Sequence, residues 1–176
     1  PSIAMIICAT SALLALTMPT IAQEASGTIT GAYNADDAVW TVSPGGEGDF
    51  PASGWVDRDN ELHVTLVGTP GEEGMYEDGT LVLSFTMTGG PQELRVVEPS
   101  VTMTAVNDGA DVMAGPDRID MQVTALERTD ESLAIAGDIV ATLTPGGLGD
   151  ITIESDDAIL IDGNFQATLT RLEGAD

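Results

Sequence analysis

The residues of this chain best suited to chemistry are oxygen ligands gathered in one short segment. Asp57, Asp59, Asn60 and Glu61 lie within five positions, and closely spaced carboxylate and amide oxygens suit a hard cation such as Ca²⁺. The segment lacks the glycine and the distal glutamate spacing of an EF-hand loop. The stretch from Val56 to Leu62 also has the pattern of a hairpin turn. The sequence therefore indicates calcium as the one candidate cofactor. The alternative is that this segment is a hairpin turn that binds no ion.

Residues for catalysis are sparse. His63 is the only histidine, and the only cysteine, Cys8, lies in the apolar N-terminal stretch. A zinc site would need carboxylates for its other ligands, and a Ser-His-Asp triad would need His63 as its base although no nucleophile motif is near it. There is no phosphate-binding glycine loop and no basic patch. We predict no catalytic residues. A small hydrolase that uses two carboxylates alone is the less favoured alternative, because no spacing selects a pair.

The aromatic residues offer a second kind of site. Trp55 and Tyr76 lie beside turns, so they are the candidates for an exposed surface that stacks on a carbohydrate or peptide partner. Trp40 alternates with Val39 and Val42, which predicts a buried position in a strand.

The elements that must position these residues are strands. Short runs of Val, Ile, Leu and Thr alternate with polar residues and are separated by Gly, Pro, Asn and Asp, which is the pattern of half-buried strands. The clearest runs are 29–30, 39–42, 62–67, 81–86, 101–105 and 119–125, in which Ile119, Met121, Val123 and Ala125 share one side. About ten strands at this spacing predict an all-β fold, an antiparallel β-sandwich of Greek-key or jelly-roll type, with a β-barrel as the alternative.

An internal echo marks the C-terminal third. Residues 133–144 match residues 159–170 at a constant offset of 26, so that Gly137 aligns with Gly163, and residues 29–33 are a shorter copy. We expect neighbouring, similar strands that bulge or bend at the glycine, not a repeated binding unit. The Gly-x-Phe-x-Ala-Thr-Leu pattern of residues 163–169 resembles the closing strand of many bacterial exported β-sandwich proteins, and it implies no functional residues.

The N-terminus has the pattern of an export signal. An apolar run from Ile3 to Leu16 is followed by Pro19 and by Thr20-Ile21-Ala22, a small-x-small motif that predicts cleavage after Ala22. We therefore expect a signal-peptide helix over residues 1–22, with an uncleaved anchor as the alternative. A single acidic domain over residues 23–176 follows, located in the periplasm or outside the cell as in bacterial secreted proteins.

The charge restricts the partners. The chain has 29 acidic and five basic residues, all beyond residue 22, for a net charge of −24. Such a charge repels nucleic acid and anionic membrane surfaces, and it attracts a diffuse layer of cations. We predict a non-catalytic binding module with a protein or carbohydrate partner. The alternative is a structural subunit of the cell envelope or of an appendage that assembles by strand pairing.

Overall fold

A computed structural model of the chain describes residues 25–33, 35–45, 50–70, 79–89, 93–106, 110–145 and 158–172. The signal peptide expected over residues 1–22 lies outside the described residues, and so does Tyr76. Among the described residues the only helix is η1, a three-residue 3₁₀ turn (Pro116–Arg118). None of the helical structure in this part of the chain has the length and hydropathy to span a membrane.

The described part of the chain is otherwise built from ten strands. Their bounds are β1 Ser26–Tyr33, β2 Asp36–Ser43, β3 Gly54–Arg58, β4 Glu61–Pro70, β5 Leu81–Thr88, β6 Arg95–Val106, β7 Ala110–Ala114, β8 Ile119–Arg128, β9 Ser132–Pro145 and β10 Ile159–Thr170.

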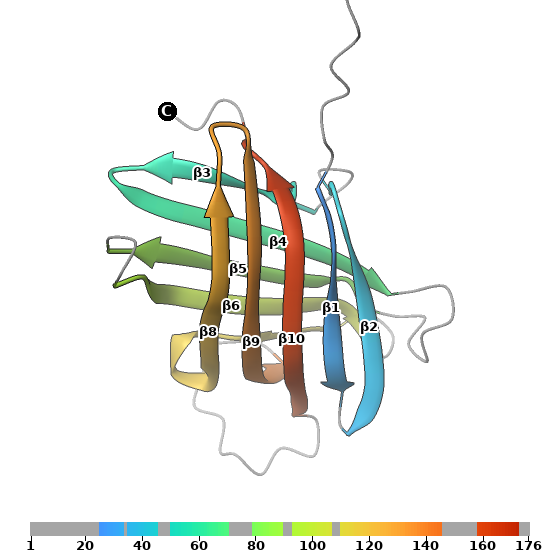
Figure 1. Cartoon of the computed structure of the whole chain (residues 1–176). Helices are drawn as coiled ribbons and strands as arrows, with labels where there is room; N and C mark the ends of the chain where they lie inside the picture. The colour runs from blue at the N-terminus through green and yellow to red at the C-terminus, as the bar shows by residue number, and fades with distance from the viewer. Residues whose placement is uncertain are drawn as a thin grey trace, which may run out of the picture.

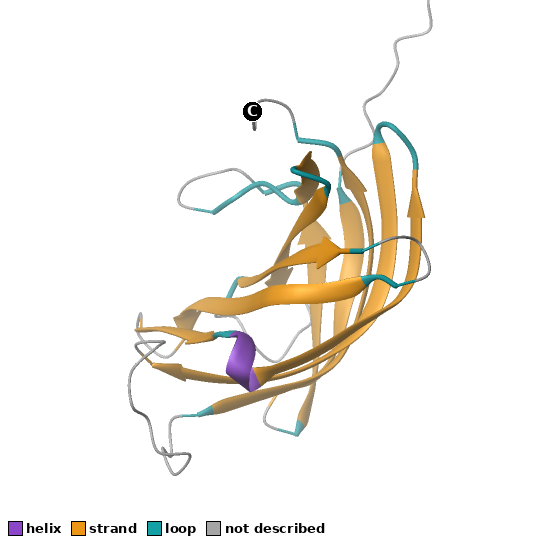
Figure 2. Ribbon diagram, turned by 90° about the vertical axis from the view of Figure 1, so that its left-hand side faces the viewer, coloured by secondary structure: helices purple, strands orange, loops and turns teal. Residues whose placement is uncertain are grey.

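These strands form two layers that enclose one apolar interior. In Figure 1 the front layer contains β8, β9, β10, β1 and β2, and the strands of the back layer, β3 to β6, run across them. Hydrogen bonding continues from β2 into β4 on one side and from β7 into β9 on another. Figure 2 shows the resulting curvature of the sheet. Every ladder between named strands is antiparallel. The predicted all-β, antiparallel fold is confirmed.

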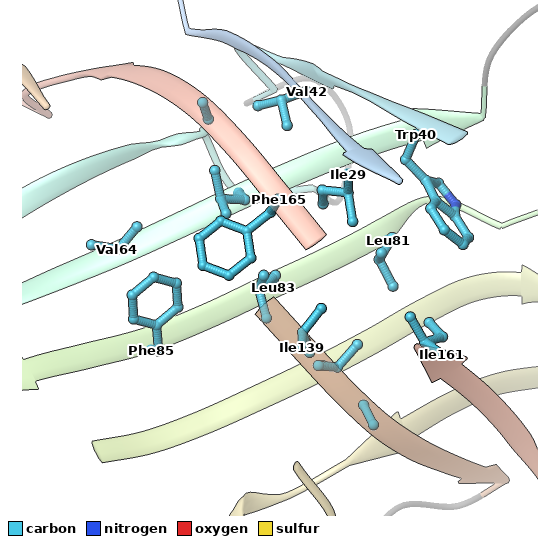
Figure 3. Close-up of a cluster of buried hydrophobic side chains, with 14 of the residues drawn as sticks. Ile29, Trp40, Val42, Val64, Leu81, Leu83, Phe85, Ile139, Ile161 and Phe165 are labelled. Carbon is cyan, nitrogen blue, oxygen red and sulfur yellow. The ribbon is translucent and has the colours of Figure 1, made fainter. Parts of the chain in front are cut away.

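Alternating side chains fill the interior. In β4, Leu62, Val64 and Leu66 are buried, with exposed fractions of 8%, 1% and 0%, while the residues between them are half-buried on the other face. Two aromatic rings from opposite layers meet in the core: Phe85 and Phe165 have centroids 5.9 Å apart and rings tilted by 48° (Figure 3). This packing follows from the period-two alternation of the sequence, because successive side chains of a strand point to opposite faces.

Trp40 is buried, as its place in the alternating run predicted. Its exposed fraction is 2%, and its indole N–H donates a hydrogen bond to the Gly79 carbonyl oxygen at 3.2 Å. A buried indole with a satisfied N–H is stabilising, because the polar group is not stranded in an apolar interior.

The echoed segments are neighbours, as expected. They form β9 and β10, which pair over twelve residues without a break in register, and the shorter copy, β1, lies on the other side of β10. Both glycines mark close approach of chains, and Gly137 also lies opposite a bulge in β8, where it pairs with Val123. A Cβ on Gly163 would lie 2.1 Å from the Thr30 carbonyl oxygen, and one on Gly137 would lie 2.6 Å from Cζ of Phe165.

One alternation was predicted wrongly. Ile119, Met121 and Val123 of β8 do pack against the core, but Ala125 is exposed. The register between β8 and β9 shifts between Val123 and Ala125, which is a β-bulge. Because a bulge inserts one extra residue, it reverses the faces of the residues that follow, and Leu126 packs against the core in the place expected for Ala125.

Candidate functional site

The candidate calcium segment is a tight hairpin turn. Arg58 pairs with Glu61 as the last rung of the β3–β4 ladder, so Asp59 and Asn60 are the two turn residues. Their φ angles are +56° and +65°. Two consecutive left-handed residues are what a type I′ turn requires, and Asp and Asn tolerate that conformation better than most residues. The turn explains why these residue types occur here.

The carboxylate of Asp57 is engaged by an arginine. Arg128, from the end of β8, forms an ion pair with Asp57 through its Nη2 atom. Within the described residues, no group of three or more histidine, cysteine, aspartate or glutamate side chains is placed to hold a metal ion. Asp57, Asp59 and Glu61 all belong to that part of the chain, so the structure does not bring them together as calcium ligands.

Trp55 is buried, which contradicts its predicted exposure. Its exposed fraction is 0%, and two guanidinium groups lie near its ring: Cζ of Arg128 is 4.6 Å and Cζ of Arg171 is 5.4 Å from the ring centroid. Both distances lie within the range of cation–π attraction. The indole N–H makes no hydrogen bond within the described residues. Trp55 therefore offers no stacking surface, and Tyr76 lies outside the described residues.

The residues after β10 close the outer edge of β3. The amide N–H of Leu172 donates to the Trp55 carbonyl oxygen at 2.9 Å, and Arg171 forms an isolated parallel bridge with Trp55. β3 is only five residues long. Its free backbone groups are thus few, and the chain itself satisfies one of them.

His63 lies on the outer face of β4 and is half-buried. Its Nδ1 atom is 2.9 Å from Oγ1 of Thr86, and the direction of this hydrogen bond depends on the imidazole tautomer. Among the described residues, no carboxylate lies within bonding distance of the ring to complete a triad. The pair therefore joins β4 to β5, and it shows no catalytic geometry.

A groove lies beside the ends of β2 and β4. It has a volume of about 710 Å³, and the described residues that line it include Ser43, Phe50, Thr69 and Thr80. None of its described lining residues has an ionisable side chain. Its described lining suits a neutral hydrogen-bonding group, and these residues supply no acid or base for a hydrolytic reaction.

β8 is the longer of two outer strands, and its second edge is open. It pairs with β9 along Ile119–Arg128, and no other strand in the described part of the chain forms a ladder with it. We use the term β8 edge for the side of Ile119–Arg128 that faces away from β9. Among the described residues no backbone hydrogen bond is made to this side, in contrast to the outer edge of β3. A strand edge of this kind presents a row of free N–H and C=O groups.

The apolar side chains beside the β8 edge differ in burial. In Figure 1 the strands of the back layer reach past β8, and Leu62 and Met87, near the ends of two of these strands, are nonetheless buried, with exposed fractions of 8% and 2%. The side chains that pack only partly against the core lie mainly here: Ile119, Met121, Val123 and Leu126 on β8, and Val96 on β6. Figure 2 faces this side of the molecule, and η1 marks the point at which β8 begins.

Analysis of the sequence alone missed this feature. It predicted the β8 strand but not its place at the margin of a layer. One signal was present: Asp120, Glu127 and Arg128 place charges on a short apolar run, and charged side chains are common on edge strands.

Comparison with known proteins adds no assignment. No family model, no curated protein and no solved structure matches the chain.

Proposed function

We propose that this chain is an exported, non-catalytic binding module that captures an extended segment of another protein along the β8 edge. The open backbone edge of β8 is the observation that carries the proposal. In strand addition, main-chain hydrogen bonds supply affinity and pockets for alternate side chains supply specificity. The open edge offers the main-chain groups, and the half-buried apolar side chains of β8 offer apolar contacts to alternate side chains of a partner.

The energetics favour occupation of this edge. An added strand would satisfy the free N–H and C=O groups of β8 and would remove Met121, Val123 and their apolar neighbours from water. Burial of apolar surface contributes about 25 cal/mol per Å². The bulge after Val123 limits regular pairing to the segment from Ile119 to Val123, which fits a short peptide better than a long sheet.

Export is supported by the leader pattern of residues 1–22 and by the absence of cysteine beyond Cys8. A cysteine-free domain depends on no disulfide, so its stability does not change with the redox state of the compartment. A net charge of −24 keeps such a module soluble.

Assembly of copies by strand pairing, as in an envelope or appendage subunit, would use the same edge. Each copy carries a net charge of −24, and the repulsion between like-charged copies opposes their contact. Light scattering over a range of protein concentrations distinguishes the two uses of the edge. A monomer is the expected result. Oligomers that form as the concentration rises, and that protect β8 from exchange, would instead support the structural subunit as the function.

The direct test is hydrogen exchange of the full chain with peptides selected from a random display library. We expect bound peptides to slow exchange in Ile119–Val123 and to leave β3 unchanged. The substitution Met121→Lys should abolish this protection, because an inward charge at an edge resists being covered. Lysine can extend to water through the open side, so the fold should persist. The control Val39→Lys makes the same charge change at an exposed position of β2 and should bind normally. Protection only at other strands, or equal binding by both variants, would refute the proposal.

A further inference from the structure

We infer that the captured segment alternates apolar and basic residues, with apolar side chains facing the interior and basic ones facing outward. This inference rests on the proposed function, since it specifies the partner of the same edge. It is carried by the different chemistry of the two faces of the sheet beside β8.

The inner face beside the edge is apolar. Ile119, Met121 and Val123 alternate along β8 and pack against the core while remaining partly exposed. Val96 of β6, which pairs with the buried Met87, belongs to the same partly covered region. Inward side chains of an added strand would lie beside these apolar groups, so apolar side chains there make the desolvation favourable.

The outer face beside the edge is acidic. The ladders align Asp120 with Val140, Asp162, Ala32 and Asp37 in one row across the front layer. The adjacent row brings Gln122 beside Asp138. No basic residue lies in either row. An outward side chain of the added strand would lie opposite Asp120, where an opposite charge is stabilising and a like charge is not.

The bases nearest to β8 in the sequence are engaged elsewhere. Arg118, just before the strand, donates a hydrogen bond to Oγ1 of Thr144 at 3.1 Å. Arg128, at its other end, is paired with Asp57. Asp120 itself forms no ion pair within the described residues, so its charge is available to a partner.

These two faces define a short pattern. Opposite Ile119–Val123 the partner carries apolar residues at its first, third and fifth positions and bases at its second and fourth. The chain itself has no lysine, and no two of its five arginines are two positions apart. No segment of this chain fits the pattern, so the partner is a different protein and not a second copy.

The test uses defined peptides about as long as β8 and the full chain, with binding followed by fluorescence anisotropy. One peptide alternates valine and lysine, a second has the same composition with the lysines grouped at one end, and a third alternates valine and glutamate. We expect the first to bind at least about tenfold more tightly than the second, because only alternation satisfies both faces. The third should not bind.

A charge reversal on the protein locates the contact. Asp120→Lys should weaken binding of the valine–lysine peptide by about tenfold, because it turns attraction across adjacent strands into repulsion. Asp162→Lys is the matched control with the same net charge. It lies two strands further from the edge, at about 14 Å from an added strand and beyond the ~10 Å screening length at 0.1 M salt. Its effect should be less than twofold.

The outcomes separate the two claims. Equal affinity for the alternating and grouped lysine peptides, or equal effects of the two substitutions, would overturn the inference. If library peptides of another pattern still protect β8 from exchange, the proposed function stands and only the partner chemistry fails. If no peptide of any pattern protects β8, both fail.

Discussion

The close contact of three strands at their glycines makes a sharp prediction about stability. Gly163→Ala should lower the free energy of unfolding by about 3 kcal/mol, the upper part of the range for overpacking in a core. The added Cβ would lie 2.1 Å from the Thr30 carbonyl oxygen and 2.7 Å from Cα of Gly31. Both are backbone atoms, so β1 and β10 must separate by nearly an ångström. Each of these strands has a neighbour on both sides, so any separation distorts a ladder whose hydrogen bonds contribute about 1 kcal/mol each.

Gly137→Ala should cost less, about 1–2 kcal/mol. Its Cβ would approach Cζ of Phe165 at 2.6 Å and the Gln122 carbonyl oxygen at 2.4 Å. Gln122 belongs to β8, which is held on one side only and can move outward. Neither glycine has a left-handed φ. Alanine therefore causes no backbone strain. It also lowers the conformational entropy of the unfolded chain, which adds about 0.4–1 kcal/mol to the free energy of unfolding in both variants and offsets part of the loss.

Urea denaturation of both variants measures these costs, with Gln166→Ala at an exposed position of β10 as the control expected within about 0.5 kcal/mol of the parent. A double-mutant cycle with Phe165→Leu adds a specific readout. The smaller side chain should rescue part of the Gly137→Ala loss, giving a coupling energy above about 0.5 kcal/mol, and should not rescue Gly163→Ala. If all glycine variants match the parent in stability, or if the coupling appears at Gly163 and not at Gly137, the strand contacts described above are wrong.

Two further predictions concern charge. Arg128→Ala should lower the free energy of unfolding by about 1 kcal/mol, because it removes a partly exposed ion pair and a cation–π contact. It should also shift tryptophan emission to the red, because Trp55 becomes accessible to water. Arg95→Ala is the matched control, and an unchanged emission maximum in Arg128→Ala would show that Arg128 does not cover the ring. Added salt should raise the melting temperature by several degrees, because screening weakens repulsion within a chain of net charge −24. Sodium and calcium chloride at equal ionic strength should act alike, and a larger rise with calcium at micromolar concentration would instead indicate a specific cation site.

Much of the fold could be predicted because its signals are local. Alternation in residues 62–67 and 81–86 gave the strands and their buried faces, and the echo between residues 133–144 and 159–170 correctly paired β9 with β10. The turn at Asp59 and Asn60 was the stated alternative to a calcium loop, and the pairing of Arg58 with Glu61 supports it.

The site could not be predicted in the same way. Trp55 sits beside a turn in the sequence, yet it is buried, and Arg128 at the end of β8 and Arg171 just after β10 lie near its ring. The ion pair that engages Asp57 joins residues 71 positions apart. No local pattern contains such contacts, since they arise only when the two layers close on each other.

The sequence by itself determined which segments are strands and which side of each strand is apolar, because the side-chain period of two is a property of the backbone. Only the tertiary structure decided which strand lies at the margin of a layer. The edge of β3 is covered by residues that follow β10, and the edge of β8 is open. Whether a strand has one neighbour or two depends on long-range pairing, and a strand's own residues carry little information about it.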